Sequence, residues 1–212
     1  MKKTILLVFA FELFLAQSSN AQLIKSYGFK VAFTSADQKY NYTYLSNMDT
    51  KRRSGFNAAI FAEWLNLPFI SIITQCEYAQ RGMGMDFNRT NSTGPTIIDT
   101  YTNYNRVDYF SIPIFAKFTL PVAPIDPYIL IGPRIDFLLG YHSDQNAFDG
   151  VYDSFSKTMT GASFAIGVDL KSVIPIALFI EARYNIDFKD SYSTQYLTVR
   201  NNSFDVWLGF AF

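Results

Sequence analysis

The sequence contains a single histidine, which lies in the tripeptide His142-Ser143-Asp144. These residue types form the triads of hydrolases, in which histidine takes a proton from a nucleophilic serine. Consecutive side chains diverge from one another, however, so these three do not assemble a triad. The single cysteine, Cys76, excludes a disulfide framework and a cysteine-based zinc site. We therefore predict a protein without enzymatic activity, cofactor or metal centre, in which His142 is a solvated loop residue.

A second set of chemically active side chains consists of charges that sit at alternate positions among apolar residues. Oppositely charged groups in such numbers form either ion pairs or a polar path for protons, ions or small solutes. Which of the two applies depends on the elements that carry them. The set comprises Lys30, Glu63, Glu77, Arg81, Lys117, Arg134, Asp136, Asp169, Glu181, Arg183 and Asp205.

Composition narrows the class of protein. The 212 residues include 18 basic and 18 acidic ones, and a net charge of zero argues against a nucleic-acid partner. Charged residues make up 17% and aromatic residues another 17%, which is not the composition of a disordered chain. Beyond the N-terminus no run of about 18 uncharged apolar residues appears, so a helical membrane protein is excluded. These features favour an aromatic-rich β protein.

The first 21 residues have the pattern of a cleaved signal peptide. Lys2 and Lys3 precede an apolar segment over residues 5–16, and Ser19-Asn20-Ala21 has the small residues of a cleavage site. We predict that residues 1–21 are removed and that residues 22–212 form the exported protein.

The rest of the chain alternates apolar residues with small or polar ones, which is the period of a β-strand. In the first segment, for example, Phe29, Val31 and Phe33 lie on one face and Lys30 and Ala32 on the other. A tilted transmembrane strand needs about 9 to 11 residues. The pattern predicts an all-β fold with one domain, an eight-stranded antiparallel up-and-down transmembrane β-barrel. Its strands are expected over residues 27–34, 55–64, 70–81, 109–118, 128–139, 163–170, 176–185 and 203–212.

The connections between these strands alternate in length. Residues 37–53, 83–105, 141–160 and 188–201 are long and polar, whereas residues 65–68, 120–127 and 171–175 are short. An up-and-down barrel then has all its long loops at one end, as bacterial outer-membrane barrels do outside the cell. Pro113 and Pro133 remove donors from the ladder, which predicts bulges or distorted register in their strands.

Alternation alone leaves two ways to orient the faces. A soluble lipocalin-like lipid carrier in the periplasm would turn its apolar face inward, around a cavity. The other face here is rich in Gly, Ala and Ser, which suits the narrow lumen of an eight-stranded barrel better than a solvated exterior. Aromatic residues near the strand ends, such as Tyr27, Trp64 and Tyr128, resemble the interfacial girdles of outer-membrane barrels. We therefore expect the apolar face to contact lipid.

With that orientation the eleven charged residues point into the lumen. Buried charges must be paired, because isolated ones cost several kcal/mol each. The nearly equal numbers of the two signs favour a salt-bridge network that plugs the lumen. A narrow pore for ions or small solutes is the alternative, since open aqueous channels need about 16 strands.

Three segments carry a resemblance to a known family. Residues 109–117 read YFSIPIFAK, residues 127–133 read PYILIGP, and residues 77–82 read EYAQRG. They resemble the Y-L-E-I-P-L-L-x-K, P-Y-x-x-x-G-P and E-x-x-Y-S-x-K-G segments of the PorT-like, porin-family outer-membrane β-barrel domain of Bacteroidetes. Ser111 stands where that family often has an acidic residue. The resemblance implies a barrel in the outer membrane, and one subgroup is similar to a component of a secretion and gliding machinery.

The predicted long loops are rich in tyrosine, which is a good contact residue because it is large, rigid and amphipathic. These tyrosines either pack over the mouth of the barrel or recognise a partner. The expected partners are outer-membrane lipid and lipopolysaccharide, together with proteins of the envelope or of a secretion machinery. Aspartates in the loops leave weak calcium binding open, although their spacing matches no EF-hand loop. The tyrosines are Tyr40, Tyr42, Tyr44, Tyr101, Tyr104, Tyr152, Tyr192 and Tyr196.

Overall fold

A computed structural model describes residues 24–44, 49–65, 67, 69–91, 94–122, 125–144, 149–170 and 177–212. The predicted signal peptide, residues 1–21, lies outside the described residues. Within those ranges no helix has the length and apolar character needed to cross a membrane. The elements are β1 (Ile24–Tyr42), β2 (Lys51–Trp64), β3 (Ile70–Asn91), β4 (Gly94–Thr119), β5 (Asp126–Ser143), α2 (Asp149–Tyr152), β6 (Thr158–Asp169), β7 (Leu178–Asp187), β8 (Tyr192–Ser193) and β9 (Leu197–Ala211).

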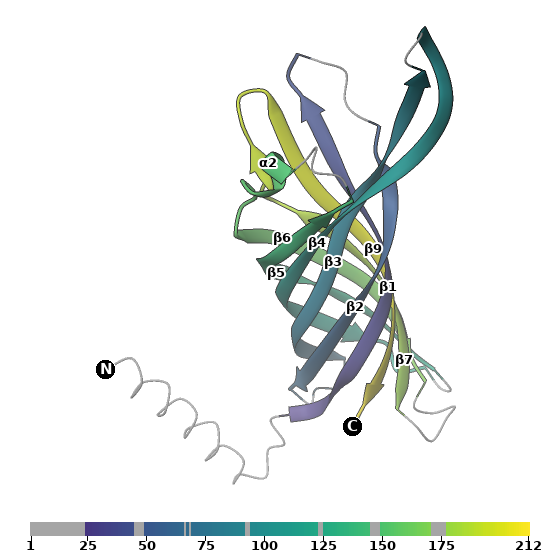
Figure 1. The fold of residues 1–212 in the computed structure, drawn as a ribbon. Helices are drawn as coiled ribbons and strands as arrows, with labels where there is room; N and C mark the ends of the chain where they lie inside the picture. Colours follow the sequence, from purple (N-terminus) through teal and green to yellow (C-terminus); the bar gives the residue numbers. More distant parts are fainter. Residues whose placement is uncertain are drawn as a thin grey trace.

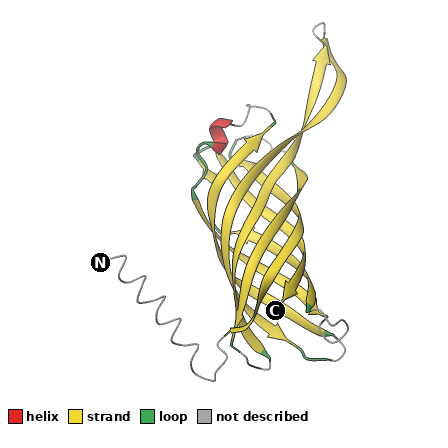
Figure 2. Cartoon of the chain, turned by 60° about the horizontal axis from the view of Figure 1, so that its bottom comes forward, coloured by secondary structure: helices red, strands yellow, loops and turns green. Residues whose placement is uncertain are grey.

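The long strands form a closed antiparallel ring (Figures 1 and 2). Each pairs with its neighbour in sequence, in the order β1-β2-β3-β4-β5-β6-β7-β9, and β9 closes the ring by pairing with β1 from Gly28↔Ala211 to Tyr42↔Leu197. The two-residue strand β8 joins only the far end of β9. The predicted eight-stranded antiparallel barrel is therefore confirmed, with β9 as its eighth strand.

The strands β3 and β4 are much longer than the alternation predicted. They stay paired up to Asn91↔Gly94, with register shifts on either side of Thr90, whereas β2 leaves β3 at Lys51↔Gly84 and β5 leaves β4 at Asn105↔Ser143. Residues 85–91 and 94–104 therefore form a two-stranded ribbon that projects beyond the barrel (Figure 1). The prediction of a long loop over residues 83–105 was wrong. Met85 and Phe87 continue the alternation into the ribbon on β3, but residues 99–103 on β4 read DTYTN and carry no apolar period.

The ribbon defines one end of the barrel, which we call the ribbon end. The opposite turn end carries the connections β2–β3, β4–β5 and β6–β7 and the C-terminus (Figure 1). The strands that contain Pro113 and Pro133 do carry a register shift, as predicted, but it does not lie at the prolines. Register between β4 and β5 is the same at Pro113↔Arg134 and at Ala116↔Ile131, and the shift in this pair lies instead between Asp108 and Tyr109.

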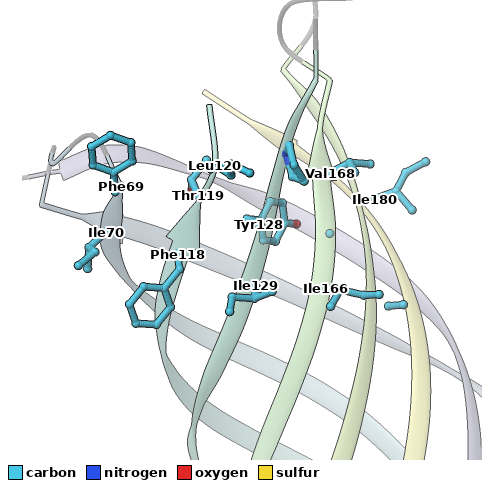
Figure 3. Close-up of a pocket in the computed structure, with 13 residues that line it drawn as sticks. Phe69, Ile70, Phe118, Thr119, Leu120, Tyr128, Ile129, Ile166, Val168 and Ile180 are labelled. Atoms are coloured by element: carbon cyan, nitrogen blue, oxygen red, sulfur yellow. The ribbon is translucent and has the colours of Figure 1, made fainter. Parts of the chain in front are cut away.

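Side-chain exposure separates the two faces of the wall as predicted. On β1, Val31 and Phe33 are 53% and 59% exposed, whereas Lys30 and Ala32 between and beside them are 2% and 6% exposed. The outward apolar residues form a belt around the barrel. Figure 3 shows part of it near the turn end, where Phe118, Ile129 and Ile166 lie on β4, β5 and β6. A lipid-carrying barrel would need the opposite arrangement, with the apolar face around an internal cavity.

Glycines on the inner face make room for large side chains. A Cβ atom at Gly167 would overlap the ring of Tyr128, and one at Gly209 would overlap the ring of Phe179. These rings therefore lie across their glycines inside the barrel. They belong to an apolar layer near the turn end, made by Phe61, Ile73, Phe115, Tyr128, Leu130, Ala165 and Phe179. Tyr128 was expected in the aromatic girdle, but its side chain is 5% exposed and lies in this inner layer instead.

Candidate functional site

All eleven charged residues predicted to point inward have buried side chains, with exposed fractions between 0% and 7%. They come from every strand of the ring, because each strand places alternate residues inside. The structure gathers most of them into three groups, which follow one another from the turn end toward the ribbon end.

The turn-end group centres on the Glu63 carboxylate. Lys117 lies 3.2 Å from one of its oxygens and Lys25 lies 2.6 Å from the other. Ser71 also donates a hydrogen bond to it at 2.7 Å. Lys25 was not among the predicted inward charges because it precedes the expected first strand. A shift in the β1–β2 register between Ile24 and Ser26 also takes Lys25 out of the alternation, so the period gives no signal for it.

The central group consists of four charged residues, and Arg183 is at its centre. Its guanidinium lies 2.9 Å from Glu77 and 2.5 Å from Glu181, and Lys30 lies 3.1 Å from Glu181. The guanidinium also lies 4.8 Å from the centre of the Phe115 ring and 4.7 Å from that of Trp207. Aromatic faces and carboxylates therefore surround the two cations, and this compensates for their removal from water.

The third group places Arg134 between two carboxylates. Its guanidinium forms ion pairs with Asp136 and Asp187. Ser111 donates a hydrogen bond to Asp136 at 2.5 Å, and Asn201 donates one to Asp187 at 3.1 Å. Asp187 was missed because the seventh strand was expected to end at residue 185. The alternation continues through it, however, and that period was a usable signal.

The remaining predicted members do not form one continuous network of ion pairs. Asp205 accepts hydrogen bonds from Thr34 at 2.5 Å and from Asn185 at 2.6 Å. Arg81 donates to the backbone carbonyl of Gln80 at 3.3 Å and has no carboxylate within 4.0 Å in the described part of the chain. Asp169 lines the same small cavity as Lys117 near the turn end.

An apolar and tyrosine-rich layer closes the lumen at the ribbon end. Tyr152 of α2 and Phe155 pack inward against Tyr40, Met83 and Tyr109. The Tyr152 hydroxyl donates to the side-chain oxygen of Gln38 at 2.8 Å. Burial raises the pKa of Tyr152, so its hydroxyl stays protonated and remains a donor.

The described residues leave little space between these layers. A cavity of about 20 Å³ lies between the turn-end and central groups and is lined by Lys30, Glu63, Gln75, Lys117 and Glu181, among others. A buried water needs roughly 10–15 Å³ on this measure, so the cavity has room for a water molecule and not for a solute. The side-chain amide nitrogen of Gln75 has no partner among the described residues and can donate to such a water.

The tripeptide at residues 142–144 forms no triad. Ser143 donates its hydroxyl hydrogen to Asn105 at 2.6 Å. His142 is exposed and lies 3.8 Å from Asp144. In the described ranges, no three His, Cys, Asp or Glu side chains are grouped as metal ligands would be.

A closed ring of eight antiparallel strands, with an apolar outer belt and ion pairs inside, defines a transmembrane β-barrel. The sequence agrees with this class, since the family model described as "Outer membrane protein beta-barrel domain" matches residues 15–193. The chain therefore belongs to the outer membrane protein β-barrel domain family. Comparison with curated proteins gives no match.

Solved outer-membrane proteins show the same type of fold. The barrel is similar to OprG of Pseudomonas aeruginosa with a TM-score of 0.50 at 7% identity, covering 88% of this chain and 95% of that one. It also matches Neisserial surface protein A (TM-score 0.45, 19% identity, 87% and 97% covered). A third match is Ail of Yersinia pestis in complex with the heparin analogue sucrose octasulfate (TM-score 0.44, 15% identity, 88% and 98% covered). At these identities the likeness concerns the fold alone.

Proposed function

We propose that this protein is a non-enzymatic outer-membrane barrel that holds a contact surface for a protein partner outside the cell. The observation that carries the proposal is the contrast between its two parts. Layers of ion pairs and apolar side chains fill the described lumen, whereas a two-stranded ribbon projects beyond the wall at one end. Outer-membrane barrels keep their short turns in the periplasm, which places the ribbon end outside the cell.

The ribbon offers backbone groups to a partner strand. Residues 85–91 and 97–103 have no neighbouring strand on their outer edges in the described part of the chain. Within the ribbon, the Phe87 and Tyr101 rings stack at 5.8 Å, and Thr102 donates a hydrogen bond to Asp86 at 2.6 Å. These contacts hold the two strands in register, so the free edges are presented as a preformed template for an added strand.

The loop tyrosines divide into two sets. Tyr40 and Tyr152 are buried in the layer that closes the mouth, and Tyr42 and Tyr192 are half-buried beside it. The exposed set consists of Tyr44, Tyr101, Tyr104 and Tyr196. Tyr44 and Tyr196 are 75% and 60% exposed, and their rings lie 6.3 Å apart. Exposed tyrosines suit recognition of a protein surface, and two of these four, Tyr101 and Tyr104, lie on the ribbon itself.

The partner class follows from the envelope location. Proteins of the envelope or of a secretion machinery are within reach of an outer-membrane barrel, and the PorT-like segments at residues 77–82, 109–117 and 127–133 support this class. A signal peptide over residues 1–21 supplies the export that this location requires. Lipid and lipopolysaccharide contact the belt itself.

A photo-crosslinking residue in place of Tyr101 tests the contact surface in intact cells. We expect a discrete protein adduct, because the ribbon edge holds a partner strand within reach. The matched control carries the same residue in place of Tyr184, which lies on the outer wall within the apolar belt and should give lipid adducts only. Residue 101 giving no protein adduct, or the same adducts as residue 184, would contradict the proposal.

A narrow conduit for ions or small solutes is the second candidate, favoured by the charges of both signs along the lumen. Recording the purified full chain in planar bilayers separates the two. Since the described lumen is filled, we expect no steady conductance from the wild-type protein, only small and rare openings. A stable, ion-selective wild-type channel would establish the conduit instead.

A further inference from the structure

A hollow of about 450 Å³ lies on the wall near the ribbon end, between β1, β7 and β9. One part of it is lined by two cations, Lys39 of β1 and Arg200 of β9, together with the amides Asn41 and Asn202. Its other part is lined by Tyr184 and Ile186 of β7 and by Phe188, which comes directly after β7. The hollow therefore combines a basic and polar half with an apolar half.

The two cations are direct register partners in the antiparallel pair of β1 and β9. Like charges directly opposite each other destabilise a sheet, so this pairing is unfavourable unless an anion lies between them. Asp190 supplies part of the compensating negative charge. The Arg200 Nε and Nη2 atoms lie 2.9 Å and 2.8 Å from one Asp190 oxygen. Lys39 has no ion pair within the described ranges, so one positive charge in the hollow is left without a carboxylate.

Asp187 also borders the hollow, but its charge is already compensated. Its side chain is buried and forms an ion pair with Arg134 on the lumenal side. It also accepts a hydrogen bond from Asn201 at 3.1 Å. The carboxylate therefore does not neutralise Lys39.

The apolar half joins the hollow to the membrane belt. Tyr184, Ile186 and Phe188 are exposed on the outer wall, with fractions between 41% and 62%. A small hydrated anion makes no favourable contact with this apolar wall. An amphiphile with an anionic headgroup and an acyl chain matches both halves at once, since its headgroup reaches the cations while its chain lies along the belt.

We propose that this hollow binds the phosphorylated headgroup of an outer-leaflet lipid. Lys39 and Arg200 contact the phosphate, Asn41 and Asn202 donate to neighbouring oxygens, and the acyl chain packs on Ile186 and Phe188. The site lies apart from the lumen and from the ribbon, so it anchors the barrel in the outer leaflet whatever the ribbon contacts.

Native mass spectrometry of the full chain in neutral-detergent micelles, titrated with diphosphoryl lipid A and with its dephosphorylated form, tests this site. We expect tighter binding of the phosphorylated form. Lys39→Gln and Arg200→Gln should each weaken it by about fivefold, the effect of one basic residue beside an anionic lipid surface. Lys39→Arg should keep most of the affinity, because it retains the charge.

The matched control is Lys51→Gln, which also removes a cation at the ribbon end, from an ion pair with Asp86 on the ribbon. It should leave lipid binding unchanged. Equal binding of the two lipid forms, or an equal loss in Lys51→Gln, would overturn the proposal. Competition by inorganic phosphate at the concentration at which the lipid binds would also overturn it, because the acyl chain would then contribute nothing.

Discussion

Replacing Arg134 by alanine is expected to lower the free energy of unfolding by about 3–5 kcal/mol, because two buried carboxylates lose their shared cation. Asp136 and Asp187 both pair with this guanidinium, and both are buried. The change is measurable as a lower urea midpoint in micelles and a lower temperature at which the fast-migrating folded form disappears from gels. Water entering the vacated space should also produce conductance in planar bilayers.

Arg106→Ala is the matched control, since it removes an arginine from the neighbouring strand β4. Arg106 lies 3.2 Å from Asp108 in a partly exposed pair, for which a loss of about 0–1 kcal/mol is expected. Adding Asp136→Asn and Asp187→Asn to Arg134→Ala should restore much of the lost stability, because no buried charge then remains unpaired. If Arg134→Ala unfolds like the wild type and only alters ion selectivity, the lumen is a hydrated conduit. The ion pairs then do not plug it.

Ile131→Arg should lower bilayer stability by about 2–4 kcal/mol, the cost of a cation near the membrane midplane on a barrel's lipid face. Ile131 is 53% exposed on the outer wall of β5, and it pairs with Ala116 and Phe164 inside the belt. Urea titration of the protein refolded in lipid vesicles measures the change.

Asn88→Arg supplies the control for this change, because Asn88 is exposed on the ribbon beyond the barrel wall. The same new charge should be nearly neutral there, where water solvates it. Equal effects at the two positions would mean that the belt does not lie in lipid.

Most of the barrel was predictable because a strand's two faces are set by local covalent geometry. Alternation placed Phe33 outside and Lys30 inside without knowledge of any partner strand, and it did the same for all eleven predicted charges. The ribbon was not predicted because Asp99, Thr100, Thr102 and Asn103 interrupt the apolar period on β4, although Met85 on the paired strand β3 still packs into the apolar layer at the ribbon end. Where both faces meet water, the apolar period carries no information about pairing.

The sequence by itself determined the class of fold, the inward position of the charges and the near equality of their signs. Only the tertiary structure decided which charge meets which. Arg183 pairs with Glu77, 106 residues away in the chain, and Arg134 pairs with Asp187, 53 residues away. Asp187 had not been included among the predicted lumenal charges. The physical reason is that these pairs depend on strand register and tilt around the closed ring, a property of all eight strands together. A period of two says which side a residue faces, and register then sets the height at which it meets its partner.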